Sequence, residues 1–102
     1  MKKLTYSEFN EVKTSGTNVV TFGAPWCKDC KVAMPLLMEL ENEYPNVNLY
    51  GVDVDEEEEI RDEMGIRHIP TVLFLKDGVE VCPRVVEPKS KAQLEECFKK
   101  LS

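Results

Sequence analysis

The chain has 102 residues, of which 42% are hydrophobic and 31% are charged. This length and apolar content predict one globular domain over residues 1–102 with a single modest core, and they exclude a disordered chain. The formal net charge of −6 argues against binding to nucleic acid or to an anionic membrane surface.

The first half of the chain predicts a β–α–β arrangement. Thr5 and Glu8 have the spacing of a capping box, which predicts a helix that begins near Thr5 and stops near Gly16. Hydrophobic periodicity then predicts a buried strand over 18–22, a long helix over 27–44 and a second strand over 47–54. Pro35 lies inside the long helix, where we expect a kink. Four apolar residues should form the inner face of that helix: Val32, Leu36, Leu37 and Leu40.

The second half predicts a short acidic helix over 56–64, a third strand over 71–75 and a final helix after Ser90. Asp77-Gly78 is a strong hairpin signal, so 79–86 should be the antiparallel partner of the third strand. Pro83 cannot donate to a ladder, which puts that partner at the sheet edge. Four residues form one apolar stripe on the last helix: Leu94, Cys97, Phe98 and Leu101. The fold class is therefore α/β, with a central mixed sheet and helices on both faces.

Two cysteines spaced three residues apart, Cys27 and Cys30, stand where the first buried strand meets the long helix. Cys27 falls at the expected helix N-terminus, where unpaired N–H groups and the positive end of the helix dipole favour a thiolate. The thiolate is the form of cysteine that attacks disulfides. The pair therefore predicts thiol–disulfide exchange.

The segment Ala24-Pro25-Trp26-Cys27 with Cys30-Lys31, followed by the stretch Ile69-Pro70-Thr71 and by Asp77-Gly78, resembles the thioredoxin family. The order of the predicted elements resembles that family along nearly the whole chain. The resemblance implies a thioredoxin fold whose first strand is short or absent here. It also implies a protein dithiol–disulfide oxidoreductase with a reversible Cys27–Cys30 disulfide.

The resemblance also implies a role for each matching residue. Cys27 would be the exposed nucleophile and Cys30 the thiol that resolves the mixed disulfide. Pro70 matches the cis-proline of the family, beside which the backbone of Ile69 would pair with an extended substrate segment. Trp26 would shield the pair and contact the partner.

Several positions depart from the family pattern. Lys28-Asp29 replaces the usual Gly-Pro between the cysteines, and these two side chains should tune the redox pair in opposite directions. Thr21 stands where thioredoxins carry a buried aspartate, and Gly51 stands where a lysine usually lies close to it. Both charges are missing together, which avoids a buried unpaired charge. We expect Cys30 to lose its proton to water or to Asp29.

Two further departures concern the surface around the cysteines. Gly23 replaces a bulky tryptophan, and Glu87-Pro88 lies where the family has a glycine loop along the substrate groove. A carboxylate in that loop should disfavour acidic partners.

The remaining cysteines leave alternatives open. A zinc site needs four ligands, and Cys82 and Cys97 could complete one. Cys97 lies on an apolar helix stripe, which favours an ordinary core cysteine, and Cys82 is interpreted as an incidental or regulatory thiol. A Cys82–Cys97 disulfide is a further alternative. We expect no bound metal.

The only histidine, a neighbouring arginine and the acidic run each allow a functional and a structural interpretation. His68, the only histidine, could donate protons near Pro70, but a solvated loop histidine is favoured. Arg67 is interpreted as a surface charge. The acidic run 53–59 lacks the spacing of a calcium loop and is interpreted as a solvated helix start.

The partners follow from this chemistry and from the resemblance. Disulfide-containing proteins would be the substrates, and no bound cofactor is needed because the electrons travel as thiols. An NADPH- or ferredoxin-linked thioredoxin reductase, or glutathione, would recycle the pair. We expect a cytoplasmic monomer without a signal peptide or a membrane span. A glutaredoxin-like or isomerase-like catalyst with a more oxidising pair, and a non-catalytic or metal-binding module, are the alternatives.

Overall fold

The structure, a computed structural model, describes residues 1–102. Its centre is a mixed sheet with the strand order β1-β3-β2-β4-β5, and β6 also pairs with β4. The strands are β1 (Lys2–Lys3), β2 (Thr17–Gly23), β3 (Asn48–Asp53), β4 (Thr71–Lys76), β5 (Val79–Glu80) and β6 (Val85–Val86). The helices are α1 (Tyr6–Val12), α2 (Lys28–Glu43), α3 (Glu58–Glu63) and α4 (Lys91–Leu101). None of them is long and apolar enough to span a membrane.

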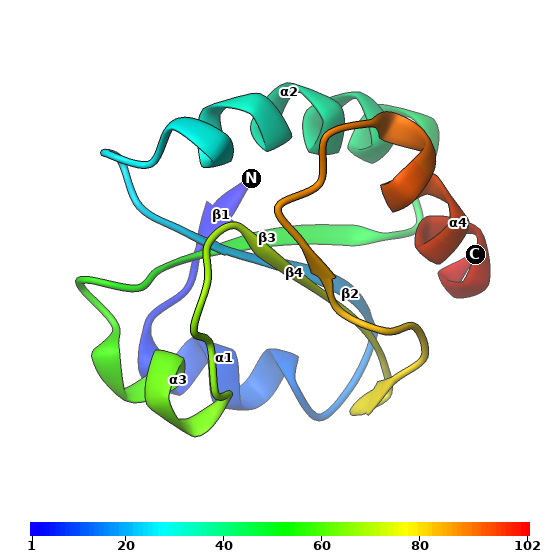
Figure 1. Ribbon diagram of the computed structural model, residues 1–102. Coiled ribbons are helices and arrows are strands. Elements are labelled where there is room, and N and C mark those ends of the chain that lie inside the picture. Colours follow the sequence, from blue (N-terminus) through cyan, green and yellow to red (C-terminus); the bar gives the residue numbers. More distant parts are fainter.

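The helices cover both faces of the sheet, as the sequence predicts. Figure 1 shows α2 and α4 on one face and α1 and α3 on the other. Each face buries its own apolar cluster, one built around Leu37, Phe74 and Phe98 and the other around Phe9 and Ile60. Because the sheet is covered on both faces, the strands β2 and β4 are buried along most of their length.

The predicted starts of α1 and α2 are confirmed in detail, whereas α3 begins at Glu58, two residues after the predicted start. Thr5 caps α1 with a complete capping box to Glu8, and Cys27 caps α2. The predicted inner face of α2 is wrong at one position, because Val32 is exposed and Ala33 is buried instead. Leu37 and Leu40 are fully buried, as expected, and Leu36 packs at the edge of the same cluster.

The partner of β4 is not one continuous strand. Asp77 and Gly78 form the expected turn with positive φ angles, but pairing to β4 is limited to the two short strands β5 and β6. The chain leaves the ladder between them around Pro83, which has no N–H to donate. The edge position is confirmed, and the departure from the ladder brings Cys82 over the core.

The parallel register of β2 and β3 decides what lies under α2. Thr21 pairs with Gly51, and Gly23 pairs with Asp53. Because residues two apart on a strand share a face and parallel partners point the same way, these four positions lie on the face that α2 covers. A Cβ built on Gly23 would lie 3.0 Å from the Cys30 sulfur, which confirms that orientation.

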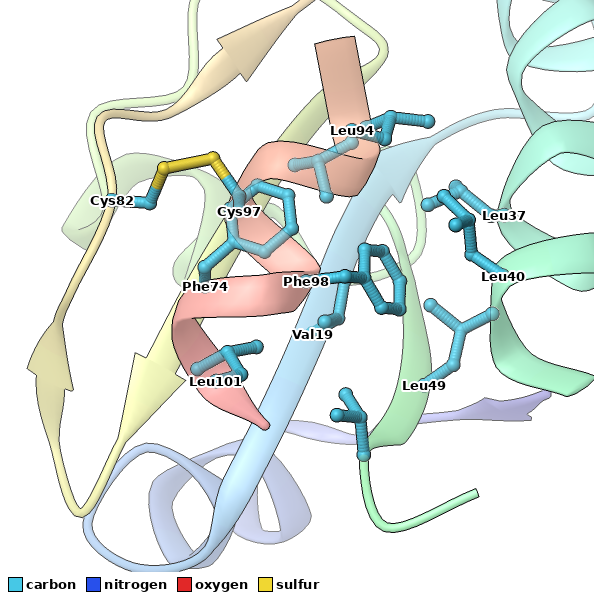
Figure 2. Packing of buried hydrophobic residues seen from close by; sticks show 12 residues of the cluster. Val19, Leu37, Leu40, Leu49, Phe74, Cys82, Leu94, Cys97, Phe98 and Leu101 are labelled. Carbon is cyan, nitrogen blue, oxygen red and sulfur yellow. A yellow bond between two sulfur atoms is a disulfide. The ribbon is translucent and has the colours of Figure 1, made fainter. Parts of the chain in front are cut away.

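Cys82 and Cys97 form a disulfide inside the apolar cluster that contains Leu37, Phe74 and Phe98. Figure 2 shows the bond joining Cys82, in the segment between β5 and β6, to α4, close to Phe74. Both cysteines are nearly inaccessible to solvent. The interpretation of Cys97 as an ordinary core thiol, and of Cys82 as an incidental or regulatory one, is therefore wrong, because the irregular segment after β5 brings Cys82 against Cys97.

This disulfide should stabilise the fold against denaturant. Its cysteines are 15 residues apart, and closing a loop of that length in the unfolded chain is worth about 3 kcal/mol. The test is a Cys27→Ser/Cys30→Ser variant, in which Cys82 and Cys97 are the only cysteines, unfolded by urea in its oxidised and reduced forms. A lower urea midpoint for the reduced form is expected, and equal midpoints would contradict the stabilising role.

Candidate redox site

Cys27 and Cys30 lie where the carboxyl end of β2, an interior strand of the sheet, leads into the start of α2. Both are free thiols, so the structure shows the reduced pair. Cys27 is the N-cap of α2, and its sulfur accepts a hydrogen bond from the backbone N–H of Cys30 at 3.2 Å. A negative charge on that sulfur would be stabilised by this donor and by the positive end of the helix dipole.

Cys27 is more enclosed than the sequence suggests, with only 6% of its surface exposed. Its thiol points at the backbone carbonyl of Ile69, 3.8 Å away, in the loop that precedes β4. The expected exposed nucleophile is therefore a sulfur packed between the start of α2 and the Ile69-Pro70 segment. The packing places it beside the backbone that the sequence analysis assigned to substrate binding.

The Ile69-Pro70 bond is cis, as the resemblance implies. The Pro70 carbonyl accepts a hydrogen bond from the N–H of Glu87 at 2.8 Å, so the Glu87-Pro88 loop lies directly beside the cis-proline. Glu87 is exposed and has a positive φ of 50°. A carboxylate thus stands at the rim of the surface around Cys27.

Trp26 is the most exposed large apolar side chain at this surface, with 66% of its area open to solvent. Its indole N–H donates a 2.7 Å hydrogen bond to the Asp55 carboxylate. That bond fixes the orientation of the ring while leaving its face available for contact with another molecule.

The two residues between the cysteines have different surroundings. Lys28 is exposed, whereas the Asp29 carboxylate is 2.8 Å from the Lys89 ammonium, which comes from the loop before α4. The pKa of Lys89 is raised, chiefly by its hydrogen bond to Asp29. The negative charge inside the Cys27–Cys30 loop is therefore partly neutralised by a residue 60 positions away in the sequence.

Burial is the main reason why the pKa of the Cys30 thiol is raised to about 12; the hydrogen bond to Cys27 and the negative charges of Cys27 and Asp29 add to the shift. Cys30 borders a mostly apolar pocket of about 300 Å³. The small residues Thr21, Gly23 and Gly51 leave this space under α2, and the side chain of Met1 reaches over Gly51.

The structure does not assemble a metal site around these cysteines. Cys82 and Cys97 are joined to each other in the core and do not complete a zinc site with the pair. No group of three or more His, Cys, Asp or Glu side chains converges on one point. His68 and Arg67 are exposed, and the only hydrogen bond at His68 is accepted by its backbone carbonyl from Thr71.

Sequence reasoning missed three polar residues of this site: Asp53, Asp55 and Lys89. The acidic run was interpreted as a solvated helix start, yet its first two carboxylates serve the site instead. Asp55 holds Trp26, and Asp53 borders the pocket beside Cys30. The alternation along β3 could have indicated that Asp53 shares a face with Gly51, whereas no sequence pattern indicates the contact of Lys89.

A profile of the thioredoxin family matches residues 1–100. The chain belongs to the thioredoxin family. It is 38% identical over 99 residues to the thioredoxin of Bacillus subtilis, covering 96% of this chain and 94% of that protein. The structure of Fasciola hepatica thioredoxin superposes with a TM-score of 0.88 at 30% identity and covers all of both chains. The structure of mitochondrial thioredoxin 3 of Saccharomyces cerevisiae, in its oxidised form, superposes with a TM-score of 0.85 at 34% identity. The match covers 97% of this chain and 93% of that chain.

Membership of the thioredoxin family makes the protein a thiol–disulfide oxidoreductase that acts on disulfide substrates. Proteins of this family generally carry no bound cofactor and take their electrons from a reductase. Thr21 and Gly51, the positions where the resemblance implies a charged pair, lie side by side on β2 and β3 in the retained thioredoxin fold. The departure is local, and it leaves a pocket beside Cys30.

The raised pKa of Cys30 predicts selective alkylation of the reduced protein. Because the folded-state pKa lies above the usual thiol value, Cys30 stays protonated through neutral pH and ionises only as the pH approaches 12. Iodoacetamide near neutral pH should therefore modify Cys27 and spare Cys30, as followed by mass spectrometry. In a Cys27→Ser variant, which keeps the burial, Cys30 should react slowly at neutral pH and faster in alkali. Reaction of Cys30 at the rate of an unstructured cysteine would contradict this assignment.

Proposed function

We propose that Cys27 is the attacking nucleophile of this oxidoreductase and that Cys30 resolves the mixed disulfide. The observation that carries the proposal is the 3.2 Å hydrogen bond from the Cys30 N–H to the Cys27 sulfur at the N-cap of α2. Cys30, by contrast, is kept neutral by burial, with a pKa of about 12. The two thiols are thus prepared for different steps.

The reaction balances as a transfer of two electrons. The Cys27 thiolate attacks one sulfur of the substrate disulfide, forms a mixed disulfide and releases the other sulfur as a thiolate that takes up a proton. Cys30 then loses its proton and attacks the Cys27 sulfur. The Cys27–Cys30 bond forms, the mixed disulfide breaks, and the second substrate sulfur leaves reduced.

We further propose that Trp26, Ile69 and Pro70 position the substrate. The Ile69 carbonyl is 3.8 Å from the Cys27 sulfur, so an extended segment running along Ile69 would bring its disulfide within reach of Cys27. The exposed ring of Trp26 would cover an apolar part of the same substrate. Lys28 and Asp29 would tune the stability of the pair, with Lys89 moderating the effect of Asp29.

The partners and setting complete the proposal. An NADPH- or ferredoxin-linked thioredoxin reductase, or glutathione, would return the Cys27–Cys30 disulfide to the dithiol. We assign the protein to the cytoplasm as a monomer, with residues 1–102 as one domain. Relatives of similar sequence include a mitochondrial thioredoxin of yeast, and imaging of the tagged protein in cells tests the cytoplasmic assignment.

A more oxidising, glutaredoxin-like or isomerase-like pair is the second candidate. It is favoured by the positive charge of Lys28 and by the Lys89–Asp29 ion pair, which weakens the opposing charge of Asp29. A stabilised Cys27 thiolate lowers the free energy of the reduced form and makes the disulfide a stronger oxidant. The two candidates share the same residues and differ in the midpoint potential.

A redox titration followed through Trp26, the only tryptophan, should show one reversible two-electron transition. The indole lies next to Cys27 in the sequence, and a disulfide formed there should quench it. Cys30→Ser should remove the transition and accumulate a mixed disulfide with substrate, whereas Cys27→Ser should form none. The midpoint potential of the Cys27–Cys30 pair tells whether the protein acts as a reductant or as an oxidant. A trace that is identical in the parent and in Cys30→Ser would leave a non-catalytic module.

The carboxylate of Glu87 should bias the choice of substrate. Because its backbone is hydrogen-bonded to Pro70 beside Cys27, an acidic substrate segment would meet like charge there. Glu87→Gln should raise the rate of reduction of an acidic disulfide peptide more than that of a basic one, and added salt should shrink the difference. Equal effects on both peptides would show that Glu87 takes no part in selection. Glu58→Gln, on the exposed first turn of α3, is the matched control.

A further inference from the structure

The attack of Cys30 on the mixed disulfide needs a base that takes up the Cys30 proton, and the pocket beside Cys30 contains a candidate. Cys30 must lose a proton before it can attack the mixed disulfide, and its raised pKa, about 12, leaves almost no thiolate at neutral pH. Thr21 on β2 is paired with Gly51 on β3, and neither residue has a group that can act as the base. The strand register and the pocket lining identify the candidate.

Asp53 is the carboxylate that borders this pocket together with Cys30. It pairs in the sheet with Gly23, and a Cβ on Gly23 would be 3.0 Å from the Cys30 sulfur. Adjacent strands lie about 4.8 Å apart, and paired residues of parallel strands point to the same face of the sheet. Asp53 therefore lies on the face that carries Cys30, one strand away from Gly23. The absence of a side chain at Gly23 keeps the space between them open.

Asp53 is also held in place. Its Oδ1 atom accepts hydrogen bonds from the backbone N–H groups of Asp55, at 2.9 Å, and Glu56, at 3.2 Å. Those bonds leave the second carboxylate oxygen, Oδ2, without a partner. Asp53, which borders the pocket, therefore keeps one carboxylate oxygen available to accept a proton.

The pocket is large enough to conduct that proton through water. Its volume of about 300 Å³ exceeds what one water molecule requires. The Thr21 hydroxyl, the Cys30 thiol and the Asp53 carboxylate all border it, so water inside would have polar partners. Small residues at positions 23 and 51 create the volume.

We propose that Asp53 accepts the proton of Cys30 through water held in the pocket between β2, β3 and α2. The inference rests on the proposed roles of Cys27 and Cys30 and deepens the second step. The Cys30 S–H bond breaks, water passes the proton to Asp53, and the Cys30 sulfur forms its bond to Cys27 while the substrate sulfur leaves with the electron pair. Asp53 then returns the proton to solvent.

Other charged groups around Cys30 are less suited to this role. Asp29 is paired with Lys89, and its charge raises the pKa of Cys30. Lys31 of α2 and Lys3 of β1 also border the pocket, but an ammonium group has no lone pair to accept a proton. Lys3 is in addition paired with Glu56. Cys27 is bonded to the substrate at this stage. Asp53 is the group at the pocket that is both anionic and outside an ion pair.

The test uses a small aromatic disulfide, 5,5′-dithiobis(2-nitrobenzoate), in stopped flow with the reduced full-length protein. Attack by Cys27 releases one coloured thiolate and resolution by Cys30 releases the second, so the two steps appear as separate phases. Asp53→Asn keeps an oxygen for the N–H groups of Asp55 and Glu56 but removes the base. It should leave the first phase unchanged and slow the second roughly 100-fold, the low end of what a positioned general base contributes.

Three further readouts separate a proton acceptor from a structural residue. The second phase of the parent should be nearly flat around neutral pH, whereas that of Asp53→Asn should rise about tenfold per pH unit as hydroxide takes over. Added acetate should restore the second phase of Asp53→Asn. Asp29→Asn should accelerate the second phase, because it removes a charge that raises the pKa of Cys30.

Gly51→Val is the companion variant that fills the pocket. Its Cβ would lie 3.2 Å from the mobile end of the Met1 side chain, so the fold can accommodate it. It should slow the second phase without rescue by acetate. Asp62→Asn, on the exposed surface of α3, is the control and should change neither phase.

The outcomes are separable. An unchanged second phase in Asp53→Asn, or a slow one that acetate fails to restore, overturns the role of Asp53. A second phase slowed by Asp29→Asn points to Asp29 as the base and overturns the proposal as well. Loss of the first phase in the parent would overturn the proposed roles of Cys27 and Cys30 themselves.

Discussion

The parallel pairing of β2 with β3 is the constraint on which the rest of the site depends. It requires the chain between them to cross over the sheet, and α2 is that crossover. The N-terminus of α2 is therefore fixed at the carboxyl end of β2, and Cys27 becomes its cap. The same register sets which residues lie under the helix, so the surroundings of both cysteines follow from one pairing.

The interior under α2 carries no charge at the two positions where the resemblance implies a buried charge pair. Replacing only one partner would leave an unpaired charge in the interior at a cost of several kcal/mol. Here Thr21 and Gly51, which face each other across the strands, are both uncharged. Their small size leaves space rather than strain, and a carboxylate at the end of the neighbouring strand borders that space. Under our proposal this carboxylate, Asp53, accepts the proton of Cys30.

Electrostatics outside the pocket connect the redox site with the last third of the chain. Lys89 reaches back to Asp29 between the cysteines, and the Glu87 backbone is hydrogen-bonded to Pro70 beside them. The loop that carries both residues follows β6 and leads into α4, and the Cys82–Cys97 disulfide ties the segment before β6 to α4. The disulfide thus restrains elements on both sides of this loop.

The sequence by itself determined the element order, the capping of α1 and α2, the hairpin at Asp77-Gly78 and the identity of the redox pair. These features are local: a periodicity, a spacing or a turn residue carries each of them. It did not determine the break between β5 and β6, the exposure of Val32, the enclosure of Cys27, the Cys82–Cys97 bond, or the contacts of Asp53, Asp55 and Lys89. Most of these depend on residues far apart in the chain that meet only when the sheet register and the helix packing are set. Tertiary structure decided them because folding brings residues that are far apart in the sequence into contact.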